Sequence, residues 1–319
     1  MPSFLAWSDW QPLVLSDWDR LAARPADGAA APGFRVAAIL AEVLDGGQTF
    51  RWVRTQDGTW QGLWSDCVAR LKPAGASGLV WSAPQALAHV VGQKLPAYLA
   101  ANVEFARLAD SLPWRSDAHL ARCLEAFSGL RLLRQPLGET LLGFLCSSTK
   151  QIVQIRQMVE LLARRHGREI VAGFHRLPTW PELADVTEEN LRACLLGFRA
   201  RYVSQTAQFL AAHPDWLEQV EKLPYADAKR RLRELPGVGE KVADCVLLFG
   251  AGRYEAFPVD VWIIKALDAR YGLEGWTPQQ TALFGRTHFG PHAGLAQQYL
   301  FAWERRFGRQ PPGSEFPAG

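Results

Sequence analysis

The stretch Leu235-Pro236-Gly237-Val238-Gly239-Glu240-Lys241-Val242-Ala243-Asp244-Cys245 decides most of what the chain reveals about its fold. A charged amphipathic run, 226–234, leads into it, and a largely apolar run, 242–249, leads out. This pattern predicts two helices joined by a tight turn, because glycine adopts positive φ values and lets another backbone approach closely. The second helix would begin directly after the turn, with its free N–H groups and positive dipole end facing outward.

This turn has a geometry that suits a phosphate group. Backbone N–H groups at a helix N-terminus bind an anion without reading any base. The stretch therefore indicates a helix–hairpin–helix over 225–250, with Gly237, Val238 and Gly239 as contacts to a DNA backbone. An ordinary glycine-containing turn between two helices explains the spacing equally well.

Lys241 falls in the first turn of the second predicted helix. An exposed surface lysine is the simplest interpretation of this residue. The alternative is a nucleophile, because the positive dipole end and burial both favour the neutral amine, which is the nucleophilic form. Cys245 follows four residues later and would share a helical face with Lys241.

Asp260 precedes an apolar helical pattern, and Pro258 ends the run before it. As a helix N-cap, an aspartate contributes about 1 kcal/mol. As an ionised carboxylate near Lys241, it would stabilise a positive charge developing on a sugar and help to move protons. One side chain can do both. A close carboxylate favours the charged ammonium whereas the dipole favours the neutral amine, and the sequence leaves this balance open.

The rest of the chain divides into a β-rich part and a helical part. Residues 34–83 have a strand-like texture, with Asp57-Gly58 between aromatic runs as a hairpin signal and 75–81 as a further strand. After about residue 87 apolar residues recur at helical spacing, as in 152–162. This order predicts an α+β protein, with an antiparallel sheet domain followed by an all-helical domain.

The length of 319 residues suggests about two domains. We expect an N-terminal extension and linker over 1–33, in which 23–33 is rich in Ala, Pro and Gly. A β-rich domain would follow over 34–115, and a helical domain would follow over 116–319.

Composition and charge limit the class of protein. The chain is 48% hydrophobic and 21% charged, which is typical of a globular protein with a sizeable core. A net charge of +3 excludes a histone-like polycation and an acidic disordered tail. It does not exclude nucleic acid, because acids elsewhere can balance a basic face. Before Ser116 the chain holds 10 basic and 10 acidic residues, so the excess lies in the helical part.

We expect no metal and no cofactor. The five cysteines are widely spaced without a CxxC pair, which argues against disulfides, zinc and an iron–sulfur cluster. His288 and His292 stand four apart, but Gly290-Pro291 between them breaks a helix. We also expect no signal peptide and no membrane association. The protein would then act in the cytoplasm at the nucleoid of a bacterium, or in the nucleus of a eukaryote.

Several short runs of sequence, spread along the chain, match the pattern of a known family. The stretch 235–264 resembles the helix–hairpin–helix DNA glycosylases, and residues 34–305 resemble the 8-oxoguanine DNA glycosylases in particular. In this superfamily a lysine at the hairpin helix marks the bifunctional members. The resemblance is carried, besides the hairpin, by Gly47–Trp52, Leu130–Gln135, Phe144–Ser148, Gly197–Val203, Pro258–Val261 and Gly290–Gln297.

The resemblance implies a bifunctional DNA glycosylase and AP lyase of base excision repair, monomeric and acting on double-stranded DNA that contains oxidised guanine. Lys241 would attack C1′ of the damaged nucleoside and form a Schiff base, after which β-elimination cleaves the strand. Asp260 would stabilise the sugar cation and assist the lysine.

The resemblance also implies a pocket that receives the flipped base. Cys245 and Phe301 would sandwich its two faces, and Gln297 would bind its Watson–Crick edge. The carbonyl of Gly47 would accept a hydrogen bond from the N7–H group that 8-oxoguanine has and guanine lacks. Such a site discriminates strongly, because the wrong base leaves a buried acceptor unpaired.

The chain departs from this family at the residues that face the opposite strand. Thr149, Lys150 and Gln151 stand where better-known members carry an Asn-rich run that fills the gap left by the flipped base. Gln154 replaces an arginine that contacts the orphaned cytosine, whereas Arg199, the other such arginine, is present. We therefore expect a weaker preference for cytosine opposite the lesion.

Two other functions stay open at this stage. One is a glycosylase of the same superfamily for another damaged base, such as an alkylated purine, and the other is a non-catalytic helix–hairpin–helix DNA-binding protein. Lys241 followed by Asp260 argues against both, because neither phosphate binding nor monofunctional base removal needs that lysine.

Overall fold

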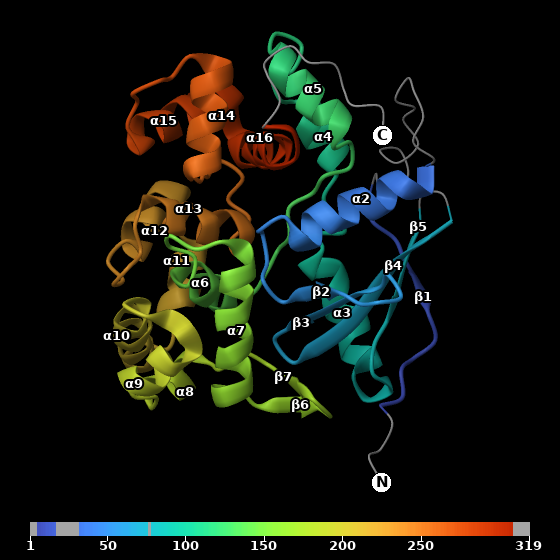
Figure 1. The fold of residues 1–319 in the computed structure, drawn as a ribbon, viewed down its shortest axis with the longest axis vertical. Helices are drawn as coiled ribbons and strands as arrows, with labels where there is room; N and C mark the ends of the chain where they lie inside the picture. The colour runs from blue at the N-terminus through green and yellow to red at the C-terminus, as the bar shows by residue number, and fades with distance from the viewer. Residues whose placement is uncertain (1–4, 17–31, 76–77, 309–319) are drawn as a thin grey trace.

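A computed structural model describes residues 5–16, 32–75 and 78–308, and it places an antiparallel sheet beside a larger helical part (Figure 1). The α+β prediction is therefore confirmed. The five strands lie in the order β1-β5-β4-β3-β2. They are β1 (Gln11–Leu13), β2 (Trp52–Arg54), β3 (Trp60–Trp64), β4 (Cys67–Ala74) and β5 (Gly78–Ser82).

The predicted Asp57-Gly58 hairpin joins β2 to β3. Gly58 has a φ of +82°, as a tight turn requires, and Trp52 pairs with Gly62 across the two strands. The absence of a side chain at Gly62 makes room for the Trp52 indole, because a Cβ there would lie 2.1 Å from the ring. The indole N–H donates to the hydroxyl of Tyr98 over 3.0 Å.

The strand-like interpretation is wrong for residues 34–45, because they belong to helix α2 (Pro32–Asp45). Their apolar residues recur every three or four positions, and burying that face beneath the sheet decides for a helix. The buried residues of α2 are Val36, Ile39, Leu40, Val43 and Leu44.

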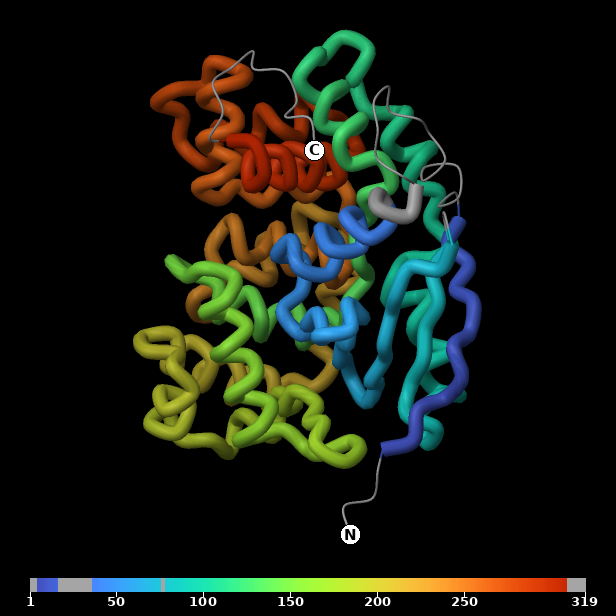
Figure 2. Tube along the Cα trace, turned by 45° about the vertical axis from the view of Figure 1, so that its right-hand side comes forward, coloured from blue at the N-terminus to red at the C-terminus, as the bar shows by residue number. Residues whose placement is uncertain are grey.

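Helix α2 bridges the two parts of the molecule (Figure 2). Its Glu42 accepts from Arg305 over 3.0 Å, and its Asp45 pairs with Arg156. Burial raises the pKa of Glu42 above its ordinary value, although the charge of Arg305 acts against the shift. The helix ends directly before Gly46 and Gly47, so these ion pairs place the Gly47 segment.

The N-terminal extension contributes to the sheet. Gln11 pairs with Trp81 of β5, and the guanidinium of Arg70 lies 3.6 Å from the centroid of a Trp7 ring. The chain from residue 5 to residue 16 is thus part of the β-rich unit. Residues 23–31 of the linker predicted over 23–33 lie outside the described residues, whereas residues 32 and 33 begin α2 and are wrongly assigned to the linker. The division into domains stays a prediction.

The helical elements fill most of the described chain from residue 85 to residue 307, and the helix pair α12 (Tyr225–Leu232) and α13 (Glu240–Phe249) is followed by α14, α15 and α16. Two small strands, β6 (Glu169–Val171) and β7 (Phe174–His175), pair between α7 and α8. No helix in the described ranges is both long and apolar enough to cross a membrane.

The bounds of the elements up to α9 are η1 (Gln85–Leu87), α3 (Ala88–Tyr98), α4 (Phe105–Asp110), α5 (Ala118–Ala126), α6 (Leu137–Leu145), α7 (Ile152–His166), α8 (Trp180–Ala184) and α9 (Glu188–Leu191). Those of the rest are η2 (Arg192–Leu196), α10 (Arg199–Ala212), α11 (Trp216–Lys222), α12 (Tyr225–Leu232), α13 (Glu240–Phe249), α14 (Val261–Tyr271), α15 (Pro278–Phe289), η3 (Gly290–His292) and α16 (Ala293–Phe307).

Candidate active site

The predicted helix–hairpin–helix is formed by α12, a turn at 233–239 and α13. Buried polar contacts hold the two helices together. Lys229 of α12 pairs with Asp244 over 2.9 Å and with Glu240 over 2.7 Å, and the Tyr225 hydroxyl donates to Asp244 over 2.7 Å. These bonds fix the direction in which the N-terminus of α13 points.

Gly237 and Gly239 have different roles in the turn. Gly237 has a φ of +79°, and a Cβ there would lie 2.6 Å from the ring of Tyr202 in α10. The turn is therefore packed closely on the Gly197–Val203 run. Gly239 is the N-cap of α13, has extended backbone angles, and would place a Cβ in open space. Both glycines are exposed, whereas Val238 between them is buried.

Replacing Gly237 by alanine should destabilise the protein by about 2 kcal/mol, because the new side chain meets both a positive φ and the Tyr202 ring. Urea unfolding followed by circular dichroism measures this change. Gly239→Ala is the comparison, and its unfolding midpoint should lie between those of Gly237→Ala and the wild type, because Gly239 has open space beside it and loses only its favourable N-cap character. Equal midpoints for all three proteins would contradict the close packing of the turn on Tyr202.

Lys241 lies in the first turn of α13, as predicted, and it reaches the C-terminal end of α6. Its Nζ donates to the hydroxyl of Ser147 over 3.1 Å and lies 5.2 Å from the centroid of the Phe144 ring. The ammonium therefore faces the positive end of one helix dipole and the negative end of another. The sequence suggested only the first of these two influences.

Asp260 is the N-cap of α14, and its Oδ1 accepts from the N–H groups of Trp262 and Ile263, each over 3.0 Å. Burial raises the pKa of Asp260 above its ordinary value. The Ile263 N–H, the charge of Lys241 and the Trp262 N–H act in the opposite direction. The charge of Lys241 therefore favours the ionised form of the Asp260 carboxyl, and burial opposes it.

Cys245 is affected by the same two charged groups. It is 3% exposed, and burial raises the pKa of its thiol to about 12, with Lys241 lowering it and Asp260 raising it. The side chain is therefore a neutral thiol at physiological pH. Such a group offers a small apolar surface beside the amine.

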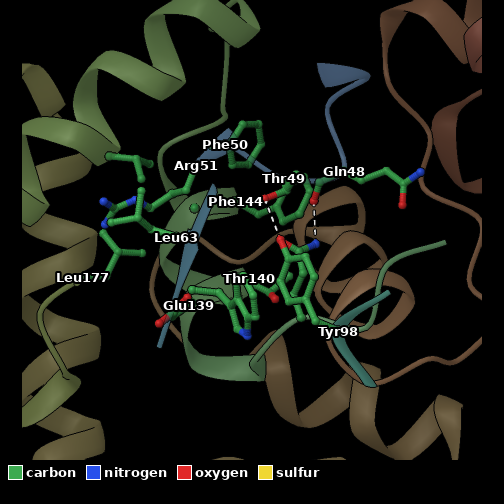
Figure 3. A pocket seen from close by; sticks show the side chains of 14 residues that line it. Gln48, Thr49, Phe50, Arg51, Leu63, Tyr98, Glu139, Thr140, Phe144 and Leu177 are labelled. Atoms are coloured by element: carbon green, nitrogen blue, oxygen red, sulfur yellow. Dashed lines mark hydrogen bonds between the residues drawn. The ribbon is translucent and has the colours of Figure 1, made fainter. Parts of the chain in front are cut away.

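The segment that follows Gly47 is anchored firmly between the sheet and α6 (Figure 3). The Gln48 side chain donates to the Arg131 carbonyl over 2.9 Å and accepts from the Leu133 N–H over 3.0 Å. Its backbone carbonyl accepts from Gln135 over 2.7 Å. The runs 47–52 and 130–135, which the resemblance singled out separately, thus form one hydrogen-bonded unit.

A cavity lies on the inner side of this segment, between Gln48–Arg51 and α6. The Thr49 and Tyr98 hydroxyl oxygens lie 3.2 Å apart in its wall, and Phe50 packs edge-on against Phe144. Figure 3 shows Phe144 at the border of this cavity. Phe50 of this segment and Lys241 therefore both lie beside the Phe144 ring.

Gly47 lies next to Phe301, as the base-recognition hypothesis requires. It has a φ of +97°, and a Cβ there would lie 3.1 Å from Ile152 and 3.9 Å from the Phe301 ring. Phe301 and Gln297 both belong to α16, and each is less than a tenth exposed. The Gln297 amide oxygen accepts from Gln298 over 2.7 Å. A side chain at residue 47 would therefore crowd Ile152 and extend toward the Phe301 ring.

Two pairs of the residues predicted to face the opposite strand are hydrogen-bonded to each other, Arg199 with Thr149 and Gln154 with Gln151. Arg199 is 2% exposed; it donates to the Ser148 carbonyl and, over 2.9 Å, to the hydroxyl of Thr149. Thr149 has a φ of +55°, an unfavourable angle for a β-branched residue. Lys150 is exposed. Gln154 is exposed as well, and its Oε1 accepts from the Gln151 N–H over 3.1 Å at the start of α7.

The sequence did not assign roles to two residues of this region. Ser147 belongs to a run that carries the family resemblance, and Ile152 is one of the apolar residues that recur at helical spacing over 152–162. Ser147 binds Lys241, and Ile152 packs against Gly47. Both contacts join segments far apart in the chain, so local sequence gives no signal for them.

His288 and His292 hydrogen-bond to Asp117 and Ser111 respectively.

Comparison with known proteins identifies the family of this chain. Residues 35–141 match the family described as 8-oxoguanine DNA glycosylase, N-terminal domain. The chain is 31% identical over 224 residues to a probable N-glycosylase/DNA lyase of Methanothermobacter thermautotrophicus, covering 63% of this chain and 72% of that protein. It is 32% identical over 277 residues to the Arabidopsis thaliana N-glycosylase/DNA lyase OGG1, covering 81% and 75%.

The chain belongs to the N-glycosylase/DNA lyase family. A DNA-bound structure of an 8-oxoguanine glycosylase/lyase from Clostridium acetobutylicum is similar over 84% of this chain and 92% of that one, at 28% identity and a TM-score of 0.78. The family assignment makes this protein a DNA glycosylase with AP lyase activity. It also confirms the resemblance on which the site residues were predicted.

Proposed function

We propose that the protein flips 8-oxoguanine out of double-stranded DNA and removes it through a Schiff base on Lys241. The observation that carries this proposal is the position of the Lys241 amine, at the start of α13 and hydrogen-bonded to the buried hydroxyl of Ser147, where its charge acts on the Asp260 carboxyl. A non-catalytic DNA-binding protein has no use for this arrangement. The similarity to the Clostridium acetobutylicum enzyme, whose structure contains cytosine opposite 8-oxoG, supports the choice of base.

The chemistry follows from the charges at the site. The electron pair of the neutral Lys241 amine forms a bond to C1′, while the electron pair of the C1′–N9 bond leaves with the base, which takes up a proton. The ionised Asp260 carboxylate stabilises the positive charge on the sugar as that bond breaks. Loss of a proton from nitrogen and gain of one by O4′ then open the ring to the Schiff base. In the β-elimination a base removes a proton from C2′, the C2′–C3′ double bond forms, and the C3′–O bond breaks so that the 3′ phosphate leaves.

Base recognition would take place between α13, α16 and the Gly47 segment. The Gly47 carbonyl would accept from N7–H of the lesion, Cys245 and Phe301 would cover its faces, and Gln297 would bind its edge. The hydrogen bonds of Gln48 support this proposal, because an anchored backbone holds its neighbouring carbonyl in place. Guanine lacks the N7–H group and would leave that carbonyl unpaired at a cost of about 1–3 kcal/mol.

The test is a single-turnover excision assay on matched duplexes that contain one 8-oxoguanine, one guanine or one 3-methyladenine at the same position. We expect release of 8-oxoguanine with strand cleavage, and no release of guanine. Release of the alkylated base alone, without strand cleavage, would overturn the proposal in favour of an alkyl-base glycosylase. Binding without release of any base would favour a DNA-binding protein.

We expect a weak preference for the base opposite the lesion. Of the three positions that face the opposite strand in better-known members, two carry other residues here, Thr149 and Gln154, and only Arg199 is retained. Excision rates opposite C, A, G and T should then lie within about tenfold of one another, because each lost base contact removes about 1–3 kcal/mol of discrimination. A steep preference for cytosine would contradict this expectation.

A further inference from the structure

Ser147 is the hydrogen-bond partner of the Lys241 amine. It lies two residues beyond the end of α6, is 6% exposed, and accepts from Lys241 Nζ over 3.1 Å. Its own hydroxyl proton is used elsewhere, because Ser147 Oγ donates to the Phe144 carbonyl over 2.7 Å. The oxygen therefore presents a lone pair, rather than a proton, to the lysine.

This arrangement constrains the direction of the amine. A neutral amine has two N–H groups and one lone pair, so donating one N–H to a fixed oxygen limits where the lone pair can point. The Phe144 ring, 5.2 Å from Nζ and itself held between Phe50 and Phe249, borders a second side of the amine. A nucleophile held in this way loses less freedom when it reaches the transition state.

We propose that Ser147 is a positioning residue, which orients the lone pair of the Lys241 amine toward C1′ of the flipped nucleoside. The inference rests on the proposed function, since it assigns Ser147 a role only if Lys241 is the nucleophile. Ser147 acts through Lys241 and touches neither the sugar nor the base in this account.

A purely structural role is the competing explanation. Serine and threonine hydroxyls often bond to the carbonyl three or four residues earlier in a helix. Thr140, in the same helix α6, provides the comparison, because its hydroxyl donates to the Pro136 carbonyl over 2.9 Å and is buried. Thr140→Val removes the same kind of bond without touching the lysine.

The experiment measures borohydride trapping on a duplex with a preformed abasic site, under saturating enzyme. We expect Ser147→Ala to lower the trapping rate about tenfold, which corresponds to about 1.4 kcal/mol. Its affinity for a duplex with an uncleavable abasic analogue should stay within about twofold, because the hairpin contacts remain. Ser147→Thr, which keeps the hydroxyl, should recover most of the rate. Thr140→Val should trap like the wild type.

Urea unfolding of each variant separates lost folding from lost chemistry. Equal trapping rates for Ser147→Ala and wild type, or equal losses in Ser147→Ala and Thr140→Val, would overturn the inference while leaving Lys241 as the nucleophile. If the wild-type protein itself formed no trapped complex, or trapped as well after Lys241→Gln, the proposed function would fall together with it.

Discussion

Lys241→Gln should abolish both base release and strand cleavage, lowering the single-turnover rate on an 8-oxoguanine duplex by at least about a thousandfold. The amide of glutamine has no basic electron pair with which to attack C1′, whereas its length and polarity are similar to those of lysine. Affinity for the duplex should fall by less than about tenfold, because the N–H groups of the hairpin remain.

Lys222→Gln is the matched control for this variant. Lys222 is an exposed lysine of α11 that pairs with Glu218, so the substitution removes the same charge from a residue outside the helix–hairpin–helix. Its excision rate should equal that of the wild type. Retained excision in Lys241→Gln would show that another group provides the nucleophile.

Asp260→Asn should slow excision on the order of a hundredfold while leaving the fold intact. The asparagine side chain can still accept from the Trp262 and Ile263 N–H groups, so the cap of α14 is kept and only the charge is lost. Asp117 also caps a helix, α5, through the Leu120 N–H, and its second oxygen bonds to Tyr271 and His288. Asp117→Asn is a control for loss of a cap charge away from Lys241, and its excision rate should be unchanged below its unfolding temperature.

The pH profile gives this prediction a second readout. Burial raises the pKa of Asp260, so the ionised carboxylate is lost at a higher pH than in an exposed aspartate, whose pKa is about 4. As the pH is lowered, the excision rate of the wild type should therefore begin to fall at a pH above about 4, the pKa of an exposed aspartate. The Asn variant carries no titrating carboxylate and should lack this limb. An unchanged acid limb in Asp260→Asn would assign it to a different group.

Short-range features of the fold could be predicted from the sequence. Asp57-Gly58 specifies a hairpin and Asp260 specifies a helix start, because each depends on the chemistry of a few adjacent residues. The hairpin helix and the position of Lys241 in its first turn followed in the same way. The strand prediction is wrong for residues 34–45, because their apolar residues form the buried face of helix α2, directly before the residues that do form the sheet.

Long-range contacts could not be predicted. The bond from Lys241 to Ser147 joins residues 94 positions apart, and the bond from Arg199 to Thr149 joins residues 50 positions apart. A local sequence pattern does not indicate which two helix ends will lie in contact in the folded protein. The packing of Ile152 on Gly47 is hidden for the same reason, since an isoleucine at helical spacing is ordinarily a core residue.

The most direct test of this account is to trap the wild-type protein on an 8-oxoguanine duplex with borohydride and to map the cross-link by peptide mass spectrometry. The account predicts one covalent adduct, on the peptide that contains Lys241, with the sugar bound to the lysine Nζ. An adduct on any other lysine, or excision of 8-oxoguanine with no adduct at all, would contradict it.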